Sequence, residues 1–219
     1  IAEMVDDEYH CAYYGKWHLG NETTRQHGFD EWLPLAELPW VIDHPETPYH
    51  QFLLANGVQT DHVTANGDPV FSSRLRSSLP EHLTMASFLA EESARFLSED
   101  RSEPFMLQVH FFEPHNPYTG PLNGLHDPES IPVGPAFMKH PEETSLFNRV
   151  RADFYSDKSG PHPKMGDFGE GTPEQKWRRL RAQYYSNVTL VDRAVGRILN
   201  ALDESGKADE TIIVFTSDH

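Results

Sequence analysis

Residues 104–112 read PFMLQVHFF, a nearly continuous apolar run that decides the fold. Strands that are half exposed alternate apolar and polar residues, whereas this run does not alternate. Its length and the prolines at positions 104 and 114 are typical of a strand buried on both faces. Such strands occur in parallel sheets covered by helices. The run therefore predicts a central strand of an α/β domain.

Helical patterns lie on both sides of this strand. Residues 84–99 place their apolar side chains on one face of a helix. A longer helix is predicted to begin at Thr172, because Pro173 suits the first helical position and Gln175 completes a capping box. Apolar residues then recur at steps of three and four, and Gly206 stands where a helix end is expected.

Two further segments are predicted to be strands. Residues 9–17 are rich in aromatic residues, and residues 211–215 (TIIVF) form a β-branched run typical of a buried strand. The alternation of helices and strands predicts an α/β fold with a mixed, mostly parallel sheet sandwiched between helices. Residues 34–79 are expected to form loops with short elements, and residues 113–171 to be loop-like, because both stretches are dense in turn-forming residues.

The composition excludes two classes of partner. The formal net charge is −16, with 34 acidic against 18 basic residues, and such a surface repels nucleic acid. An anionic substrate would need a local cluster of cations. The apolar stretches are far shorter than the ~20 residues that cross a bilayer, so no membrane span is expected. A single cysteine, Cys11, excludes an intramolecular disulfide.

Three clusters of chemically active residues each follow a predicted strand. They are residues 15–20 (GKWHLG), 113–118 (EPHNPY) and 217–219 (SDH). In open α/β sheets, ligands bind beyond the carboxyl ends of the strands. We therefore expect the three clusters to share one site.

The first cluster can bind an anion. Alternation of side chains would put Lys16 and His18 on the same side, with Trp17 facing the other way. A neighbouring ammonium and imidazole make a compact pair for a negatively charged group. The alternative is a strand end with a core tryptophan and two exposed polar residues.

The other two clusters can supply an acid and metal ligands. Prolines restrict the loop around His115, and a histidine held in this way can protonate a leaving-group oxygen. Asp218 is suited to a hard divalent cation, and His219 beside it can also coordinate. The alternatives are a solvated loop histidine and an ordinary turn closed by an aspartate side chain.

Taken together, these clusters resemble the sulfatase family of the alkaline phosphatase superfamily. Order and spacing agree over nearly the whole chain, including residues 15–20, 27–29 (HGF), 104–118, 191–196 (VDRAVG) and 215–219. The resemblance implies an incomplete alkaline-phosphatase-like fold, in which residues 1–219 are part of one catalytic domain truncated at both ends. It also implies hydrolysis of sulfate monoesters.

The resemblance implies a role for each candidate residue. Lys16 corresponds to the lysine that binds the sulfate oxygens, and His18 to the histidine that contacts the modified nucleophile. His115 corresponds to the histidine near the ester oxygen. Asp218, with His219, corresponds to the ligands of a divalent cation, usually calcium, with manganese as the alternative. His219 stands where the family often has asparagine, and a histidine there resembles the iduronate-sulfatase and phosphonate-monoester-hydrolase branches.

The family's nucleophile is a formylglycine made from the first residue of a C/S-x-P-x-R motif. No such motif occurs in these residues, since Cys11 is followed by Ala12-Tyr13-Tyr14. We expect the nucleophile to lie outside this chain, and the 219 residues to be inactive by themselves. The expected substrate is a small-molecule or glycan sulfate ester, and the expected location is the periplasm or the cell exterior.

Three alternatives stay open at this stage. One is hydrolysis of phosphonate monoesters or phosphodiesters on the same scaffold, because a lysine, a histidine and a metal ligand would serve a phosphoryl group equally well. The second is a non-catalytic relative that binds sulfated glycans. The third is an unrelated acidic α/β binding domain in which the three clusters occur together by coincidence.

Overall fold

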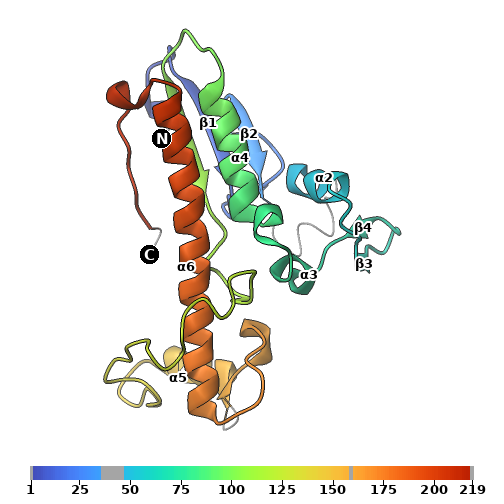
Figure 1. The fold of residues 1–219 in the computed structure, drawn as a ribbon, viewed down its shortest axis with the longest axis vertical. Helices are drawn as coiled ribbons and strands as arrows, with labels where there is room; N and C mark the ends of the chain where they lie inside the picture. Colours follow the sequence, from blue (N-terminus) through green and yellow to red (C-terminus); the bar gives the residue numbers. More distant parts are fainter. Residues whose placement is uncertain (1, 36–46, 158–159, 218–219) are drawn as a thin grey trace.

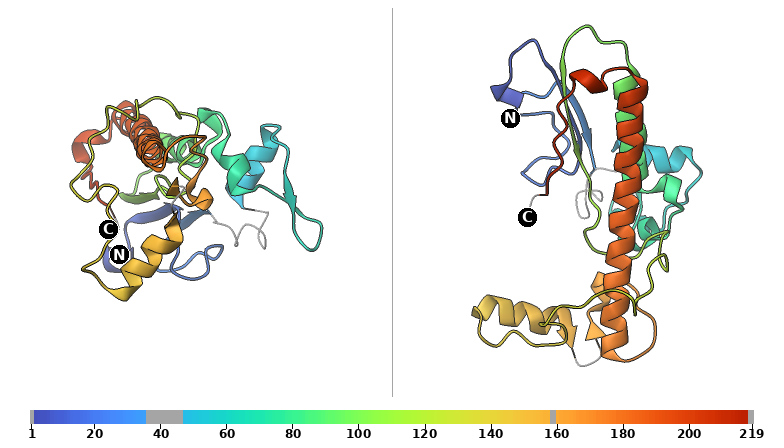
Figure 2. Two further views of the ribbon diagram at one scale, coloured as in Figure 1. Left: turned by 90° about the horizontal axis from the view of Figure 1, so that it is seen from below. Right: turned by 60° about the vertical axis from the view of Figure 1, so that its left-hand side comes forward.

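The computed structural model describes residues 2–35, 47–157 and 160–217 (Figure 1). Within these ranges a small sheet lies against two long helices, and the longer of the two extends well beyond the sheet (Figures 1 and 2). The α/β class and the parallel sheet predicted from the sequence are confirmed.

The sheet has three parallel strands in the order β2-β1-β5. Its central strand is β1 (His10–Gly15), which pairs with β2 (Glu31–Pro34) on one side and β5 (Phe105–His110) on the other. The strand predicted at residues 104–112 is thus confirmed. Its side chains are at most half buried, however, because β5 is one of the two edge strands of the described sheet.

Alternate side chains of β1 enter two different clusters. Ala12 and Tyr14 face the helices and belong to the main core, whereas Cys11 and Tyr13 face the opposite side. There they pack with Phe29 and with partly buried side chains that include Trp17 and Trp32. We call this second group the aromatic cluster. Burial on both faces explains why β1 carries almost no polar residues.

The two long helices are α4 (Met85–Ser98) and α6 (Pro173–Glu204), and both follow the predicted bounds closely. Thr84 caps α4, and the capping box of Thr172 and Gln175 opens α6. Each cap satisfies helix N–H groups and contributes about 1 kcal/mol. Small residues let the helices approach each other, since Ala86 and Ala90 of α4 meet Leu190 and Ala194 of α6. Gly206 has a φ of +72°, as expected just past a helix end.

Short elements fill the stretches predicted as loops, of which residues 36–46 lie outside the described part. The helix α5 (Leu146–Tyr155) was not predicted, although apolar residues recur along it at helical spacing, because it lies within a long stretch dense in turn-forming residues; none of its residues is buried. The remaining elements are η1 (Ala2–Met4), α2 (Pro48–Ala55), β3 (His62–Val63), β4 (Pro69–Val70), α3 (Ser73–Ser77), η2 (Glu81–Leu83), α5 (Leu146–Tyr155), β6 (Ser156–Asp157), β7 (Gly160–Pro161), η3 (Pro163–Met165) and η4 (Ala208–Glu210).

The prediction of a buried strand at residues 211–215 is wrong for this structure. The segment is extended, but it forms no strand, and Ile212, Val214 and Phe215 are at least 80% exposed. A β-branched run shows only that a segment suits a sheet. A strand also needs a neighbouring strand for its hydrogen bonds and a layer that covers its side chains. Within the described part of the chain, the segment has neither.

In the described ranges, no helix combines the length and the apolar character that crossing a bilayer requires.

Candidate functional site

The carboxyl ends of β1 and β5 meet at one edge of the sheet. Gly15 is the last residue of β1 and pairs with His110, the last residue of β5. The φ of Gly15 is +117°, and a Cβ placed there would lie 2.0 Å from the carbonyl oxygen of His110. Only glycine fits this close approach. The N–H of Lys16 then donates to the same oxygen at 3.1 Å, which fixes Lys16 beside the segment that follows β5.

The two residues after Gly15 point to opposite faces of the sheet, as the sequence predicted. The Lys16 ammonium lies 5.1 Å from the centroid of the Phe112 ring, a cation–π contact on the helix-covered face. Trp17 instead enters the aromatic cluster, with its ring centroid 5.0 Å from both Tyr13 and Trp32. The Tyr13 hydroxyl donates to the Lys16 carbonyl oxygen and holds the turn between them.

His115 lies in the loop after β5. Its ring centroid is 4.9 Å from that of Phe112, and its Nδ1 is 2.8 Å from the carbonyl oxygen of Asn116. A carbonyl oxygen only accepts, so Nδ1 is the donor in this bond. This orients the ring and leaves Nε2 to exchange a proton. The side chain is exposed, and the peptide bonds before Pro114 and Pro117 are both cis.

The structure therefore brings two of the three clusters together. Lys16 and His115 contact the same Phe112 ring, so their separation cannot exceed the sum of the two distances to that ring. His18 is exposed in the turn that follows, with a φ of +54°. Among the described residues, no ring contact or hydrogen bond joins His18 to Lys16 or His115.

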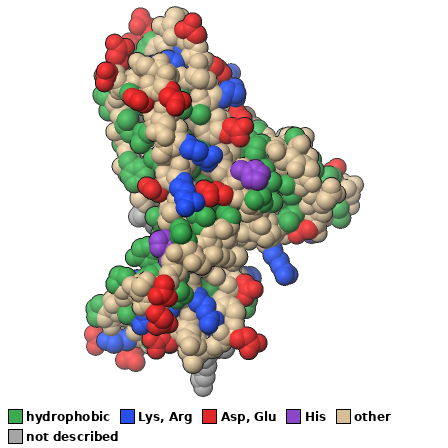
Figure 3. All heavy atoms as spheres, viewed as in Figure 1, with side chains coloured by type: hydrophobic (Ala, Val, Ile, Leu, Met, Phe, Trp, Pro, Cys, Tyr) green, Lys and Arg blue, Asp and Glu red, His purple; other side chains and the backbone are tan. Residues whose placement is uncertain are grey.

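The third cluster cannot be placed, because Asp218 and His219 lie outside the described residues. Within residues 2–35, 47–157 and 160–217, no three His, Cys, Asp or Glu side chains are grouped so that they could hold a metal ion. These residues therefore do not form a metal site by themselves. Acidic side chains gather toward both ends of the face shown in Figure 3, in keeping with the net charge of −16. An anion thus depends on local cations such as Lys16.

A pocket opens next to His115. It is a half-open hollow of about 490 Å³, solvent at its mouth included, and lies between α3, the beginning of α4, the loop after β5 and the middle of α6. Phe112 and His115 both line it, so the pocket adjoins the ring that Lys16 also contacts. Its walls combine apolar side chains such as Met85 and Leu190 with polar ones. A pocket of this mixed character is suited to a small organic group.

The sequence did not single out two charged residues of this pocket, Glu113 and Arg76. Burial raises the pKa of the Glu113 carboxyl, and backbone N–H groups and the Arg76 guanidinium only partly offset that effect. Its Oε2 is buried and accepts no hydrogen bond from the described residues. A charged residue directly after the apolar run was the available signal for Glu113. No local signal marks Arg76, because its burial depends on how α3 packs.

Comparison with known proteins shows the family of this chain. The family model described as Sulfatase matches residues 1–219. Among curated proteins, the chain is 29% identical over 156 residues to an arylsulfatase of Clostridium perfringens (64% of this chain, 27% of the relative). It is 30% identical over 154 residues to the mouse (Mus musculus) iduronate 2-sulfatase (65% of this chain, 27% of the relative).

A further relative and a solved structure carry other activities in their names. The multifunctional alkaline phosphatase superfamily protein PehA of Trinickia caryophylli is 27% identical over 152 residues (65% of this chain, 28% of the relative). The crystal structure of the phosphonate monoester hydrolase of Agrobacterium radiobacter matches with a TM-score of 0.60 at 19% identity. That match covers 92% of this chain and 43% of the other, and it shows the fold. The chain therefore spans less than half the length of each of these four proteins.

Proposed function

Because the chain belongs to the sulfatase family, we propose that the protein hydrolyses sulfate monoesters, with Lys16 and His115 at its active site. One observation carries the proposal. A cation from the end of β1 and an imidazole from the loop after β5 contact one ring, Phe112, at the carboxyl edge of a parallel sheet. That edge is where α/β folds bind their ligands.

The chemistry of a sulfate ester fits these two side chains. The ester is anionic, and negative charge moves onto the bridging oxygen as its bond to sulfur breaks. In the proposed mechanism, the Lys16 ammonium binds the non-bridging sulfate oxygens and neutralises their charge. His115, protonated at Nε2, gives its proton to the departing alcohol oxygen. The bond from Nδ1 to Asn116 keeps Nε2 turned away from the protein backbone.

Other parts of the machinery are proposed from family membership. His18 is expected to contact a formylglycine nucleophile, and Asp218 and His219 to bind a divalent cation, calcium in the first place and manganese as the alternative. The described residues form no metal site by themselves. The proposed substrate is a small-molecule or glycan sulfate ester, and the proposed location is the periplasm or the cell exterior.

Hydrolysis of phosphonate monoesters or phosphodiesters is the second candidate. The match to a phosphonate monoester hydrolase structure supports it, since the same scaffold carries that activity there. A phosphoryl group and a sulfuryl group are both tetrahedral, and Lys16 could bind the oxygens of either.

The test compares substrates that share a leaving group. The complete protein is assayed with 4-nitrophenyl sulfate, 4-nitrophenyl phenylphosphonate and bis(4-nitrophenyl) phosphate in the presence of calcium or manganese. We expect kcat/KM to be at least ~10-fold higher for the sulfate, a difference of about 1.4 kcal/mol in transition-state binding. Higher rates on either phosphorus ester would favour the second candidate. No turnover of any of the three would contradict both.

A further inference from the structure

A buried tyrosine reaches the proposed active site from the opposite face of the sheet. Tyr13 is 2% exposed and belongs to the aromatic cluster, whereas the Lys16 side chain extends over the other face to the Phe112 ring. The Tyr13 hydroxyl nevertheless donates to the backbone carbonyl oxygen of Lys16. Tyr13 therefore contacts the part of the chain from which the Lys16 side chain projects.

Neighbouring rings hold the Tyr13 ring in place. Trp32 of β2 and His110 of β5 stack on it from the two neighbouring strands, with centroid distances of 4.7 Å and 4.6 Å. Trp17 and Phe29 make T-shaped contacts with it at 5.0 Å and 5.3 Å. Such contacts leave an aromatic ring little freedom to move. The position of the hydroxyl is therefore set by the packing of the ring.

The Tyr13 hydroxyl stays a donor over a wide pH range. Burial and, to a smaller extent, the charge of Glu22 raise the pKa of the phenol, so the hydroxyl keeps its proton. A buried hydroxyl is costly unless it is hydrogen-bonded. The Lys16 carbonyl oxygen meets this need, and the bond is therefore expected to persist in the folded protein.

The backbone around Lys16 is fixed at three consecutive groups. The carbonyl oxygen of Gly15 accepts from the N–H of Leu35 at 3.0 Å, and the N–H of Lys16 donates to the carbonyl oxygen of His110 at 3.1 Å. The bond from Tyr13 fixes the third group, the carbonyl of Lys16 itself. The first two bonds continue the sheet, whereas the third depends on a side chain.

We propose that Tyr13 is a positioning residue for the proposed reaction, because its hydroxyl holds the Lys16 backbone so that the ammonium lies where the sulfate oxygens bind. The inference rests on the proposed sulfatase function, in which Lys16 neutralises the sulfate charge. It goes further by giving a residue on the opposite face of the sheet a role in activity. A shift of about 1 Å in a group that binds the reacting part of a substrate can cost as much as ~10²-fold in rate.

Tyr14 provides a matched control, since it is the next residue of β1 and has the same side chain. It is 1% exposed, and its hydroxyl donates at 2.7 Å to Glu31, the first residue of β2. Tyr13→Phe and Tyr14→Phe each remove one hydroxyl and its hydrogen bond and keep the ring. We expect both variants to lower the melting temperature of the complete protein by a similar amount, at most ~4 °C.

Activity should separate the two variants. Tyr13→Phe should lower kcat/KM on 4-nitrophenyl sulfate by ~10-fold, and Tyr14→Phe by less than ~2-fold. A double-mutant cycle then tests whether Tyr13 acts through Lys16. In a Lys16→Ala background, Tyr13→Phe should cost less than a further ~2-fold, because the group that it positions is absent. Equal losses in the two tyrosine variants, no loss in Tyr13→Phe, or an undiminished loss in the Lys16→Ala background would overturn the proposal.

Hydrogen exchange separates a failure of this inference from a failure of the proposed function, because it needs no substrate. The Lys16 N–H should exchange faster in Tyr13→Phe than in wild type or in Tyr14→Phe. Equal exchange in all three proteins would show that Tyr13 does not hold this turn, and would overturn the proposal. If wild-type protein released no sulfate from 4-nitrophenyl sulfate, the sulfatase function would fail, even if faster exchange in Tyr13→Phe showed that Tyr13 holds the turn.

Discussion

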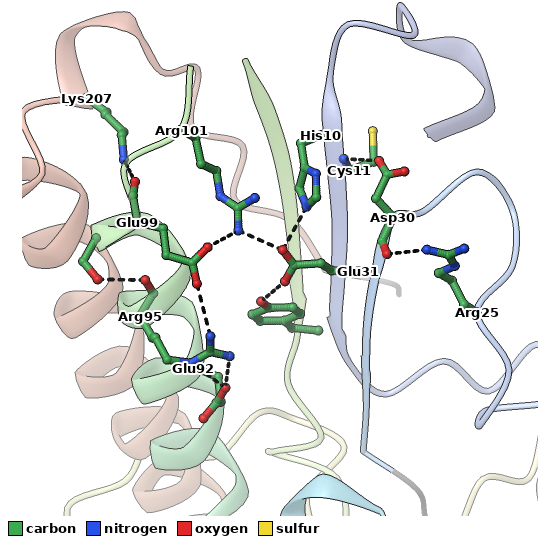
Figure 4. Close-up of polar contacts among 12 residues, drawn as sticks. His10, Cys11, Arg25, Asp30, Glu31, Glu92, Arg95, Glu99, Arg101 and Lys207 are labelled. Carbon is green, nitrogen blue, oxygen red and sulfur yellow. Dashed lines mark hydrogen bonds and ion pairs between the residues drawn. The ribbon is translucent and has the colours of Figure 1, made fainter. Parts of the chain in front are cut away.

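Charged residues make different contacts where the strands begin, which we call the amino edge of the sheet, and where the strands end, the carboxyl edge. At the amino edge, the Glu31 carboxylate receives hydrogen bonds from His10 (2.8 Å), Tyr14 (2.7 Å) and Arg101 (2.8 Å), as Figure 4 shows. Arg101 also pairs with Glu99, which in turn pairs with Arg95 of α4.

At the carboxyl edge, the charged and titratable groups make other kinds of contact. Lys16 lies over an aromatic face, His115 is exposed with one bond to a backbone oxygen, and Glu113 keeps a buried oxygen that no described residue contacts. Charges that satisfy one another stabilise the fold, whereas titratable groups that gather beyond the carboxyl ends of parallel strands are suited to a ligand. The comparison therefore predicts that mutations at the amino edge affect stability and those at the carboxyl edge affect activity.

Lys16→Ala should give the largest effect. Removing the cation that binds the sulfate oxygens is expected to lower kcat/KM on 4-nitrophenyl sulfate by ~10²–10³-fold in the complete protein, by analogy with the loss of one oxyanion-stabilising group. The melting temperature should change little. Lys164 is a matched control, since its ammonium also lies over a phenylalanine ring, that of Phe154, at 6.0 Å. A similar loss of kcat/KM in Lys164→Ala would show that the effect is not specific to the carboxyl edge.

The loss of activity in His115→Asn should depend on the leaving group of the substrate. An alkyl alcohol needs a proton as it departs, and 4-nitrophenolate needs it far less, so the loss should reach ~10²-fold on alkyl sulfates and stay much smaller on the aryl ester. The rates are measured with both esters. His140→Asn, which removes an exposed histidine paired with Asp153 (2.9 Å), is the control and should leave both rates unchanged. An equal loss on both esters would argue against proton donation by His115.

Glu31→Gln should lower the stability of the protein and leave its activity nearly unchanged. The amide cannot satisfy three donors, so we expect a loss of about 1–2 kcal/mol in the free energy of unfolding, reduced from the value for a fully buried network because Glu31 is partly exposed. Denaturant unfolding measures this loss. The kcat/KM of the folded protein should stay within ~2-fold of wild type. A large loss of activity at unchanged stability would contradict the assignment of this edge to the fold.

The smallest expected effect is a difference in pH dependence between the two edges. Hydrogen bonds from Tyr14, His10 and Arg101 outweigh desolvation and lower the pKa of Glu31. Its stabilisation is therefore present above the unfolded-state pKa, near 4.5, and is lost as the pH falls through the lower folded-state pKa. The pKa of Glu113 is raised by burial, so its contribution is present below pH 4.5 and is lost as the pH rises through the folded-state pKa.

Unfolding measured against pH in the Glu31→Gln and Glu113→Gln variants separates these two contributions. The free energy of unfolding of Glu31→Gln, relative to wild type, should increase as the pH falls. That of Glu113→Gln, relative to wild type, should increase as the pH rises above about 4.5. If both variants gained relative stability in the same pH range, the two edges would not differ in pH dependence.

Much of the fold could be predicted from local patterns. The Thr172–Gln175 capping box and the apolar periodicity after it located α6, and the run at residues 104–112 located β5. These features depend on neighbours in the sequence. The failure at residues 211–215 has the complementary cause, because strand formation depends on a pairing partner elsewhere in the chain. The helix α5 was missed for another reason, since its apolar residues recur at helical spacing but stand among the turn-forming residues of a long loop-like stretch.

The sequence by itself determined which residues could do chemistry, because a glycine-bounded lysine and a proline-flanked histidine at strand ends are local features. Only the tertiary structure decided that Lys16 and His115 contact one ring, that a carboxyl oxygen of Glu113 is buried beside the same pocket, and that three side chains converge on Glu31. The physical reason is that distance, burial and the balance of charges arise between segments remote in the chain. No periodicity or motif within one segment records them.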